Sequence, residues 1–229
     1  MNKVKISLVL NIVNICLIFF AVIAMLTGFK FMGDDTILAL KGASAFQFFT
    51  FDSNLLMGIV SIIYVAYLIM VLKGKREEIP KIVHLMKYIS TVAVSLTMFT
   101  VVFFLAPFLA SSYFSLFLNS NLVFHFLAPL ISIIAFIFFD KYKQINKKEI
   151  WLGLAPTILY GIYYSINVFI HMEGGSVEYK YDWYGFAQGG AISIILSILL
   201  MNLSTLLIGF LIYLVNKKVN KKEVKEYER

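Results

Sequence analysis

A threonine and a histidine in this chain could together carry out nucleophilic catalysis. Thr50 and His125 both lie within long apolar stretches, where a polar side chain needs a partner or a purpose. A threonine hydroxyl becomes a good nucleophile when a base removes its proton, and histidine is the usual base. In an apolar pocket, this pair could attack the acyl carbon of a lipid ester. The two residues are therefore our candidate nucleophile and general base.

The elements that hold these residues are six apolar runs. The chain has 229 residues, of which 60% are apolar and 14% are charged, against about 25% charged in an average soluble domain. This composition excludes an ordinary soluble protein and a disordered one. A helix crosses a membrane with about 20 residues, and the runs lack the alternation of barrel strands. The sequence predicts an all-α integral membrane protein, one six-helix domain over residues 1–229, with spans at 6–28, 46–72, 88–110, 120–139, 151–171 and 189–215.

The basic residues give the expected orientation. All lysines and arginines except Lys30, Lys41 and Lys180 fall on one side of the six spans, and such an excess marks the cytoplasmic side. Both termini are therefore expected in the cytoplasm. The net charge of +7 then reflects topology, and no nucleic-acid partner is expected. A composition rich in lysine, isoleucine, asparagine and phenylalanine suggests a bacterial cell membrane.

Polar residues are expected to gather in the outer half of the membrane. Thr50 and His125 each lie about five residues into their spans, roughly 7 Å below the outer boundary at a helical rise of about 1.5 Å per residue. Further polar groups of this layer are candidates for substrate binding, namely Asp52, Ser53, Asn54, Asn121, Tyr164, Asn167, His171 and Gln188. The inner half is expected to hold far fewer, chiefly Asn11, Asn14, Asn202, Ser204 and Thr205.

Three residues near the span ends lead to more specific expectations. Asp52 could cap its helix, pair with a lysine of the outer surface, or be neutral. Pro129 removes the helical hydrogen bond to the carbonyl of His125, so a distortion is expected beside the imidazole. His84 is expected in a cytoplasmic loop, solvated or interfacial, and no lysine is expected well inside a span.

Each candidate also has a purely structural interpretation. Threonine commonly bonds to its own helix backbone, and histidine and asparagine commonly tie membrane helices together. A metal site from His125, His171 and Asp52 is a weaker alternative, because no local spacing brings these ligands together. The chain has no glycine-rich phosphate loop and only one cysteine, Cys16, so no cofactor is expected. The aromatic residues of the outer loop at 172–188 form either a belt at the membrane surface or a lid over an outward-opening site.

Short motifs around these residues resemble those of the androgen-induced/ADTRP-type membrane proteins, and most closely their bacterial relatives. The motifs are Thr50 with Ser53 and Asn54, His125 with Pro129 and Asp140, Pro156 with Tyr160, and Tyr181-Asp182-Trp183-Tyr184. The resemblance implies six spans, cytoplasmic termini and hydrolysis of fatty acid esters of hydroxy fatty acids. It also implies that Thr50 is the nucleophile and His125 its partner. Ser53 departs from the animal proteins, which carry an acidic or amide residue there, so the substrate need not be the same.

Two other functions fit the same spans. The chain could be the substrate-binding subunit of a vitamin transporter, although Ala21 and Ala24 lack the four-residue spacing that such subunits use to dock an energising partner. It could also be a non-catalytic membrane protein whose polar residues only fix helix packing. The hydrolase interpretation instead expects membrane lipids as partners and an acyl lipid as substrate, entering from the outer leaflet.

Overall fold

A computed structural model describes residues 3–33, 42–109, 113–140 and 145–227, with side chains described through residue 220 except at 109. Within these ranges the chain is 83% helical and has no strands. Six of its helical segments are long and apolar enough to cross a membrane. Helices suit that medium because they satisfy their own backbone hydrogen bonds. The expected all-α, multi-pass membrane architecture is therefore confirmed.

The crossing segments follow the predicted spans, with earlier starts for the third and fifth. In chain order they are α1 (Lys3–Thr27); α2 (Phe49–Leu72); α3 (Lys81–Thr100) with η2 (Val101–Leu105) and α4 (Ala106–Leu109); α5 (Ser120–Leu122), η4 (Val123–Leu127), α6 (Ala128–Ile134) and η5 (Ala135–Phe139); η6 (Lys147–Leu154) with α7 (Ala155–Ile170); and η7 (Phe186–Gly189) with α8 (Gly190–Tyr227). Two short helices, η1 (Gly42–Gln47) and η3 (Tyr113–Phe117), lie in the connections. We call the stretch from α5 to η5 the fourth segment.

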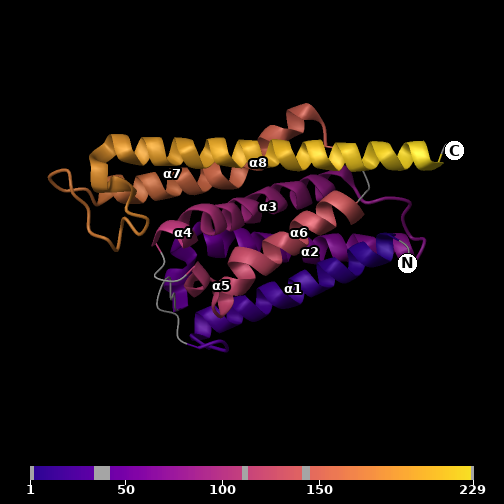
Figure 1. Ribbon diagram of the computed structural model, residues 1–229, viewed down its shortest axis with the longest axis horizontal. Coiled ribbons are helices and arrows are strands. Elements are labelled where there is room, and N and C mark those ends of the chain that lie inside the picture. Colours follow the sequence, from indigo (N-terminus) through magenta and orange to yellow (C-terminus); the bar gives the residue numbers. More distant parts are fainter. Residues whose placement is uncertain (1–2, 34–41, 110–112, 141–144, 228–229) are drawn as a thin grey trace.

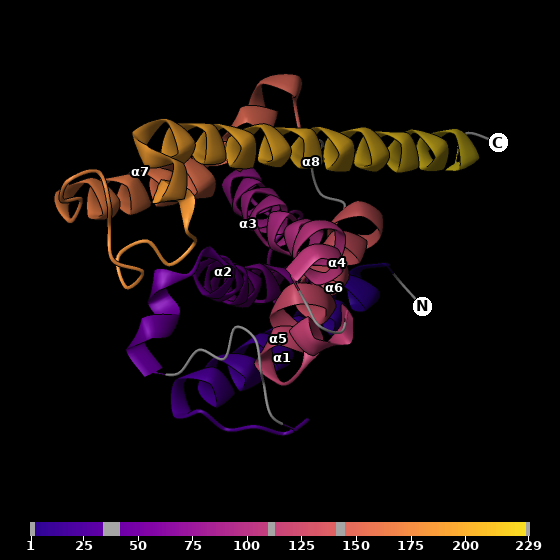
Figure 2. The same cartoon turned by 60° about the vertical axis from the view of Figure 1, so that its left-hand side comes forward.

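Four of the segments form a central group. α1, α2, α3 and the fourth segment pack around one another, and α7 and α8 run side by side along the flank of α3 (Figure 1). A turned view shows α8 lying over α3 and apart from α1 and α2 (Figure 2). α1 begins and α8 ends at the same end of the bundle (Figure 1), which we call the terminal end. The opposite end, where α2 begins and α7 ends, is the loop end.

The fourth segment is irregular around the histidine, as Pro129 predicts. η4 is a turn of π-helix centred on His125, and the N–H of Ala128 bonds to the carbonyl of Val123, five residues back. Pro129 follows at the start of α6. Because proline cannot donate to the carbonyl of His125, the chain widens into a π turn here. The expected distortion beside the imidazole is confirmed.

The buried polar residues contradict the expectation that the half of the bundle near the termini holds far fewer polar groups than the other half. The interior near the terminal end holds fully or almost fully buried polar side chains on all four central segments, namely Ser7, Asn11, Asn14, Ser61, His84, Lys87, Ser90, Ser132 and Asp140. Two predictions are therefore wrong: His84 is not solvated, and a lysine does lie well inside a span. The physical reason is that α3 packs against α2, the fourth segment and α8, so its polar face meets protein rather than lipid or water.

Candidate functional site

Thr50 sits in the first turn of α2, at the loop end. The helix begins after Phe48, which makes no side-chain cap, so Asp52 in this turn does not act as the expected cap. The carbonyl of Thr50 accepts the Oγ–H of Ser53 at 3.2 Å and the Nδ2–H of Asn54 at 2.8 Å. Thr50 is half-buried.

His125 is fixed in a defined orientation by the connection at the loop end. Its side chain is 2% exposed, and its Nδ1 lies 2.9 Å from the carbonyl oxygen of Leu116 in η3. A carbonyl can only accept, so Nδ1 carries the hydrogen, and in the neutral form of the ring Nε2 is the basic nitrogen. The Phe117 ring stands edge-on to the imidazole, with centroids 6.5 Å apart. This tautomer is the one that a general base requires.

Asn54 links the turn of Thr50 to the turn of His125. Its Nδ2 donates to the carbonyl of Thr50 and, at 3.2 Å, to the carbonyl of Phe124, the residue before His125. Its Oδ1 is buried and has no hydrogen-bond donor within the described part of the chain, although a buried carbonyl oxygen normally has one. Among the hydrogen bonds of the described residues, none joins the Thr50 hydroxyl to the imidazole. The structure thus brings the two backbone turns together without pairing the two side chains.

Asp52 and Ser53 line a lipid-facing groove between α2 and α7. The groove has a volume of about 250 Å³. The residues around it are Phe49, Asp52, Ser53, Leu56, Pro156, Leu159, Tyr160 and Tyr163. Ser53 also reaches α3, with its Oγ 3.3 Å from Oγ1 of Thr97. The Asp52 carboxyl group offers a polar contact to a lipid chain in this mostly apolar groove, although Thr50 is not one of the lining residues.

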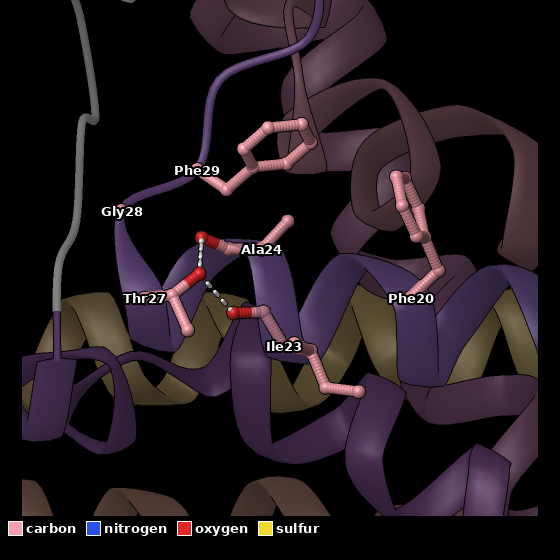
Figure 3. A pocket seen from close by; sticks show the side chains of 6 residues that line it. All are labelled: Phe20, Ile23, Ala24, Thr27, Gly28 and Phe29. Carbon is pink, nitrogen blue, oxygen red and sulfur yellow. Dashed lines mark hydrogen bonds between the residues drawn. The ribbon is translucent and has the colours of Figure 1, made fainter.

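A second groove, of about 480 Å³, lies at the loop end of α1 and offers no chemistry. Phe20, Ile23, Ala24 and Phe29 form its apolar wall (Figure 3). Its one hydroxyl, on Thr27, donates to the carbonyls of Ile23 at 2.8 Å and Ala24 at 3.3 Å (Figure 3). Such bonds to the residue's own helix are the ordinary role of threonine in a membrane helix.

The aromatic loop between α7 and α8 packs against α7. Asp182 and Trp183 are buried. Asp182 accepts the hydroxyl of Tyr164 and, at 3.0 Å, the N–H of Ala187. Trp183 donates its indole N–H to the hydroxyl of Tyr160 at 2.9 Å. These bonds make the loop a packed cover over the loop end of α7.

The same cover reaches the start of α2. The hydroxyl of Tyr160 donates to the carbonyl of Gln47 at 2.5 Å, and the N–H of Phe49 donates to the hydroxyl of Tyr184 at 3.0 Å. Burial raises the pKa of Tyr184 to about 12, so that its hydroxyl stays neutral and can accept this bond. The loop therefore fixes the entry of α2, one residue before Thr50.

Two further candidates, Asn167 and His171, support the loop between α7 and α8 rather than the Thr50 turn. Asn167 donates to the carbonyl of Tyr181 at 2.7 Å, and Nδ1 of His171 lies 2.7 Å from the carbonyl of Asn167. The His171 ring stacks on Tyr181, with centroids 3.6 Å apart. Gln188 is exposed and Asn121 is buried. No cluster of three metal-binding side chains occurs within the described ranges. His125 contacts η3 whereas His171 contacts the loop after α7.

Removal of the Asp182 carboxylate should loosen this cover. In Asp182→Ala, a buried backbone N–H and a tyrosine hydroxyl lose their acceptor, which typically costs about 1–3 kcal/mol per group. We expect a lower thermal midpoint in detergent and faster trypsin cleavage at the exposed Lys180. Glu178→Ala is the matched control, because that carboxylate pairs only with Lys180 at the surface. Equal cleavage rates for the two variants would contradict the packed cover.

Comparisons with known proteins give no family. No family model, curated protein or solved structure matches this chain. The resemblance described from the sequence motifs therefore remains a prediction.

Proposed function

We propose that this protein is a membrane-embedded hydrolase of lipid esters, with Thr50 as nucleophile and His125 as base. The observation that carries the proposal is the Asn54 bridge, which holds the backbone of Thr50 next to the turn of His125. The unpaired Oδ1 of Asn54 marks a place where a water or a substrate hydroxyl is needed. The tautomer of His125 leaves Nε2 free to accept a proton.

The proposed reaction is acyl transfer through a covalent intermediate. The Thr50 Oγ1 attacks the acyl carbon of the ester, its proton passes to Nε2 of His125, and the leaving alcohol then takes that proton. Water, activated by the same nitrogen, hydrolyses the acyl-threonine and releases the fatty acid. Thr50 and Nε2 must come within hydrogen-bond reach when substrate binds, since such contacts are often loose in the free enzyme.

Asn54 acts in this scheme as a positioning residue. Both hydrogens of its amide group are engaged, one on the carbonyl of Thr50 and one on that of Phe124. It therefore has no donor left for a developing oxyanion, a role for which the sequence offered it as a candidate. Its contribution is to hold two helices at the spacing that the reaction requires.

Substrate entry and orientation complete the proposal. The groove that Asp52 and Ser53 line lies between α2 and α7, next along the chain from Thr50, and we propose it as the path by which an acyl lipid enters from its own leaflet. The excess of basic residues near the terminal end supports a cytoplasmic location for both termini. The loop end then faces the outer leaflet, in our proposal that of a bacterial cell membrane.

Labelling with a fluorescent fluorophosphonate tests the nucleophile. We expect the detergent-purified wild type to be labelled, Thr50→Ala to lose at least nine-tenths of the label, and Thr50→Ser to keep it, because serine retains the hydroxyl. Thr27→Ala is the matched control, since that hydroxyl bonds only to its own helix. Labelling that persists in folded Thr50→Ala would exclude Thr50 as the nucleophile.

A structural role for the same residues is the second candidate function. Two observations favour it: His125 ties the fourth segment to η3 through the carbonyl of Leu116, and Asn54 ties it to α2. Such bonds are typical of helix packing in membranes. In that case no variant changes labelling, and Asn54→Ala lowers only the thermal midpoint.

A further inference from the structure

Asp140 is a buried carboxyl group with only one of its two oxygens paired. It ends the fourth segment at the terminal end, and its side chain is 0% exposed. Oδ1 accepts the Oγ–H of Ser7 at 2.5 Å and the Nδ2–H of Asn11 at 3.3 Å. Oδ2 is buried and accepts from no donor among the residues that the structure describes. Asp182 at the loop end, by contrast, has a donor on each oxygen.

Lys87 is the matching buried cation. It projects from α3, is 0% exposed, and donates to Oγ of Ser61 at 2.9 Å and to Sδ of Met57 at 3.3 Å. Its ammonium also lies 5.9 Å from the centre of the Tyr64 ring. An ammonium has three hydrogens, and among the described residues only these two accept from it. A buried ammonium normally requires a counter-charge as well.

The two charges interact without touching. The rings of His84 and Tyr88, on the same turn of α3 as Lys87, pack on Phe136, one turn before Asp140, with ring centroids 5.1 and 5.7 Å apart. Lys87 and Asp140 therefore lie on neighbouring turns, yet among the described residues no ion pair joins them. Two further buried oxygens nearby also lack donors, Oδ1 of Asn11 and Oδ1 of Asn14. Asn11 contacts Asp140. Asn14 lies one turn after Asn11 on the same face of α1, and its Nδ2 donates to Oγ of Ser132 at 2.8 Å.

The unpaired acceptors and the Lys87 ammonium together indicate which chemical group can satisfy them. Three unpaired acceptors need donors, and one ammonium hydrogen needs an acceptor. Water supplies both, and a buried water typically makes about three such bonds. A second cation would supply neither an acceptor for Lys87 nor relief from its charge. A hydrated carboxyl group can also bind and release protons.

We propose that Lys87 and Asp140 form a water-bridged ion pair whose carboxyl group exchanges protons with the solution at the terminal end. Protonation transfers one proton from solvent water to Oδ2, which turns the carboxylate into a neutral acid that donates a hydrogen bond. Deprotonation returns that proton and restores the pair with Lys87. Buried ionisable residues in membrane proteins commonly have a function, because their burial is costly.

The proton site and the pair of Thr50 and His125 lie toward opposite ends of the bundle. Ile18 and Ala128 are fully buried in one hydrophobic cluster and follow the Asn14–Ser132 bond toward the loop end. On α3, buried hydroxyl side chains continue from Lys87 toward the loop end, namely Ser90, Thr91, Ser95 and Thr97. The two sites share no residue, so the proton site does not depend on the proposed hydrolysis.

Several other ionisable groups lie on the elements around Asp140. On α1, the buried residues that face it are neutral. The ionisable groups of the other packed elements are Tyr64 on α2, His84, Lys87 and Tyr88 on α3, Glu149 on η6 with its partner Lys81, and Tyr213 and Lys217 on α8. Lys141 and Lys143, next along the chain, lie outside the described residues. Burial raises the pKa of the Asp140 carboxyl above its ordinary value, against the opposing effects of Lys87, Ser7 and Asn11.

Infrared spectroscopy of the full chain in lipid nanodiscs tests the proposal. We expect an absorption of a protonated carboxyl group that disappears as the pH rises and is absent from Asp140→Asn. In Lys87→Met its midpoint should move upward by about one pH unit or more, because the nearby positive charge is gone. Lys87→Arg, which keeps the charge, should move it far less. In deuterated buffer the band should shift within the mixing time, as expected of a hydrated group.

The control is Asp182→Asn, which removes a buried but fully bonded carboxylate at the other end. This variant should keep the titrating band. A band that persists in Asp140→Asn would overturn the proposal, as would no pH-dependent band in the wild type. Exchange that takes minutes or longer would show a dry, sealed carboxyl group and would equally contradict it. If Asp140→Asn does not fold, the Lys87→Met and Lys87→Arg midpoints decide, and equal midpoints in both would refute the pairing.

Discussion

Replacement of His125 by asparagine should lower ester hydrolysis by about 10²–10⁴-fold, the usual contribution of a general base. Asparagine places an N–H where Nδ1 of the imidazole stands, so it can still donate to the carbonyl of Leu116. It has nothing in place of Nε2 to accept the proton of Thr50. The variant therefore keeps the tie to η3 and loses only the base. The measurement is hydrolysis of a fluorogenic acyl ester by the purified protein in detergent.

This substitution separates catalysis from packing, which His125→Ala would not. A thermal midpoint close to that of the wild type, together with a large loss of activity, supports the role as base. His125→Gln is the complementary variant, because its longer amide cannot reach Leu116 in the same way and should lower the midpoint. If His125→Asn hydrolyses the ester as fast as the wild type, His125 is a packing residue and the hydrolase proposal fails.

The sequence predicts the six spans well because hydropathy and span length are local properties. It misplaces the start of α3 because a lysine at position 87 was assumed to need water. In the structure Lys87 finds Ser61 and Met57 on α2 instead, and the helix extends back to Lys81. The helical spacing of Ser7, Asn11 and Asn14 along α1 is the signal that could have indicated a polar interior at this end.

The candidate site is predicted only in part, for reasons of geometry. Equal depth of Thr50 and His125 follows from counting residues, but the direction of each side chain does not. The π turn at η4 changes the angular position of the residues after it, and His125 points to Leu116 in a connection that the sequence leaves undefined. The Asn54 bridge spans two helices, so no local spacing could reveal which carbonyls it would contact.

Loss of the Lys87 charge should destabilise the protein more than any other single change considered so far. In Lys87→Met the Asp140 carboxylate remains buried without its counter-charge, and breaking a buried pair in this way typically costs about 3–5 kcal/mol. Asp140→Asn leaves the ammonium alone and should also destabilise. The double variant Lys87→Met/Asp140→Asn contains no buried charge at this site and should recover most of the loss. Thermal unfolding in detergent measures all three variants against the wild type.

Acid should rescue the single lysine variant, and the sign follows from the raised pKa of Asp140. Above the ordinary aspartate value of 3.8, the folded state then binds more protons at this carboxyl than the unfolded state does. The stability of the folded state therefore falls as the pH rises from the ordinary aspartate pKa toward the higher pKa of Asp140 in the folded state. In Lys87→Met this pH range is wider, because without the ammonium the pKa of Asp140 rises further. We expect the deficit of Lys87→Met to shrink as the pH falls toward the ordinary aspartate value of 3.8, while the double variant shows no such change. Additive effects of the two substitutions, with the same pH dependence in all variants, would mean that Lys87 and Asp140 are not energetically coupled, since only coupled residues depart from additivity.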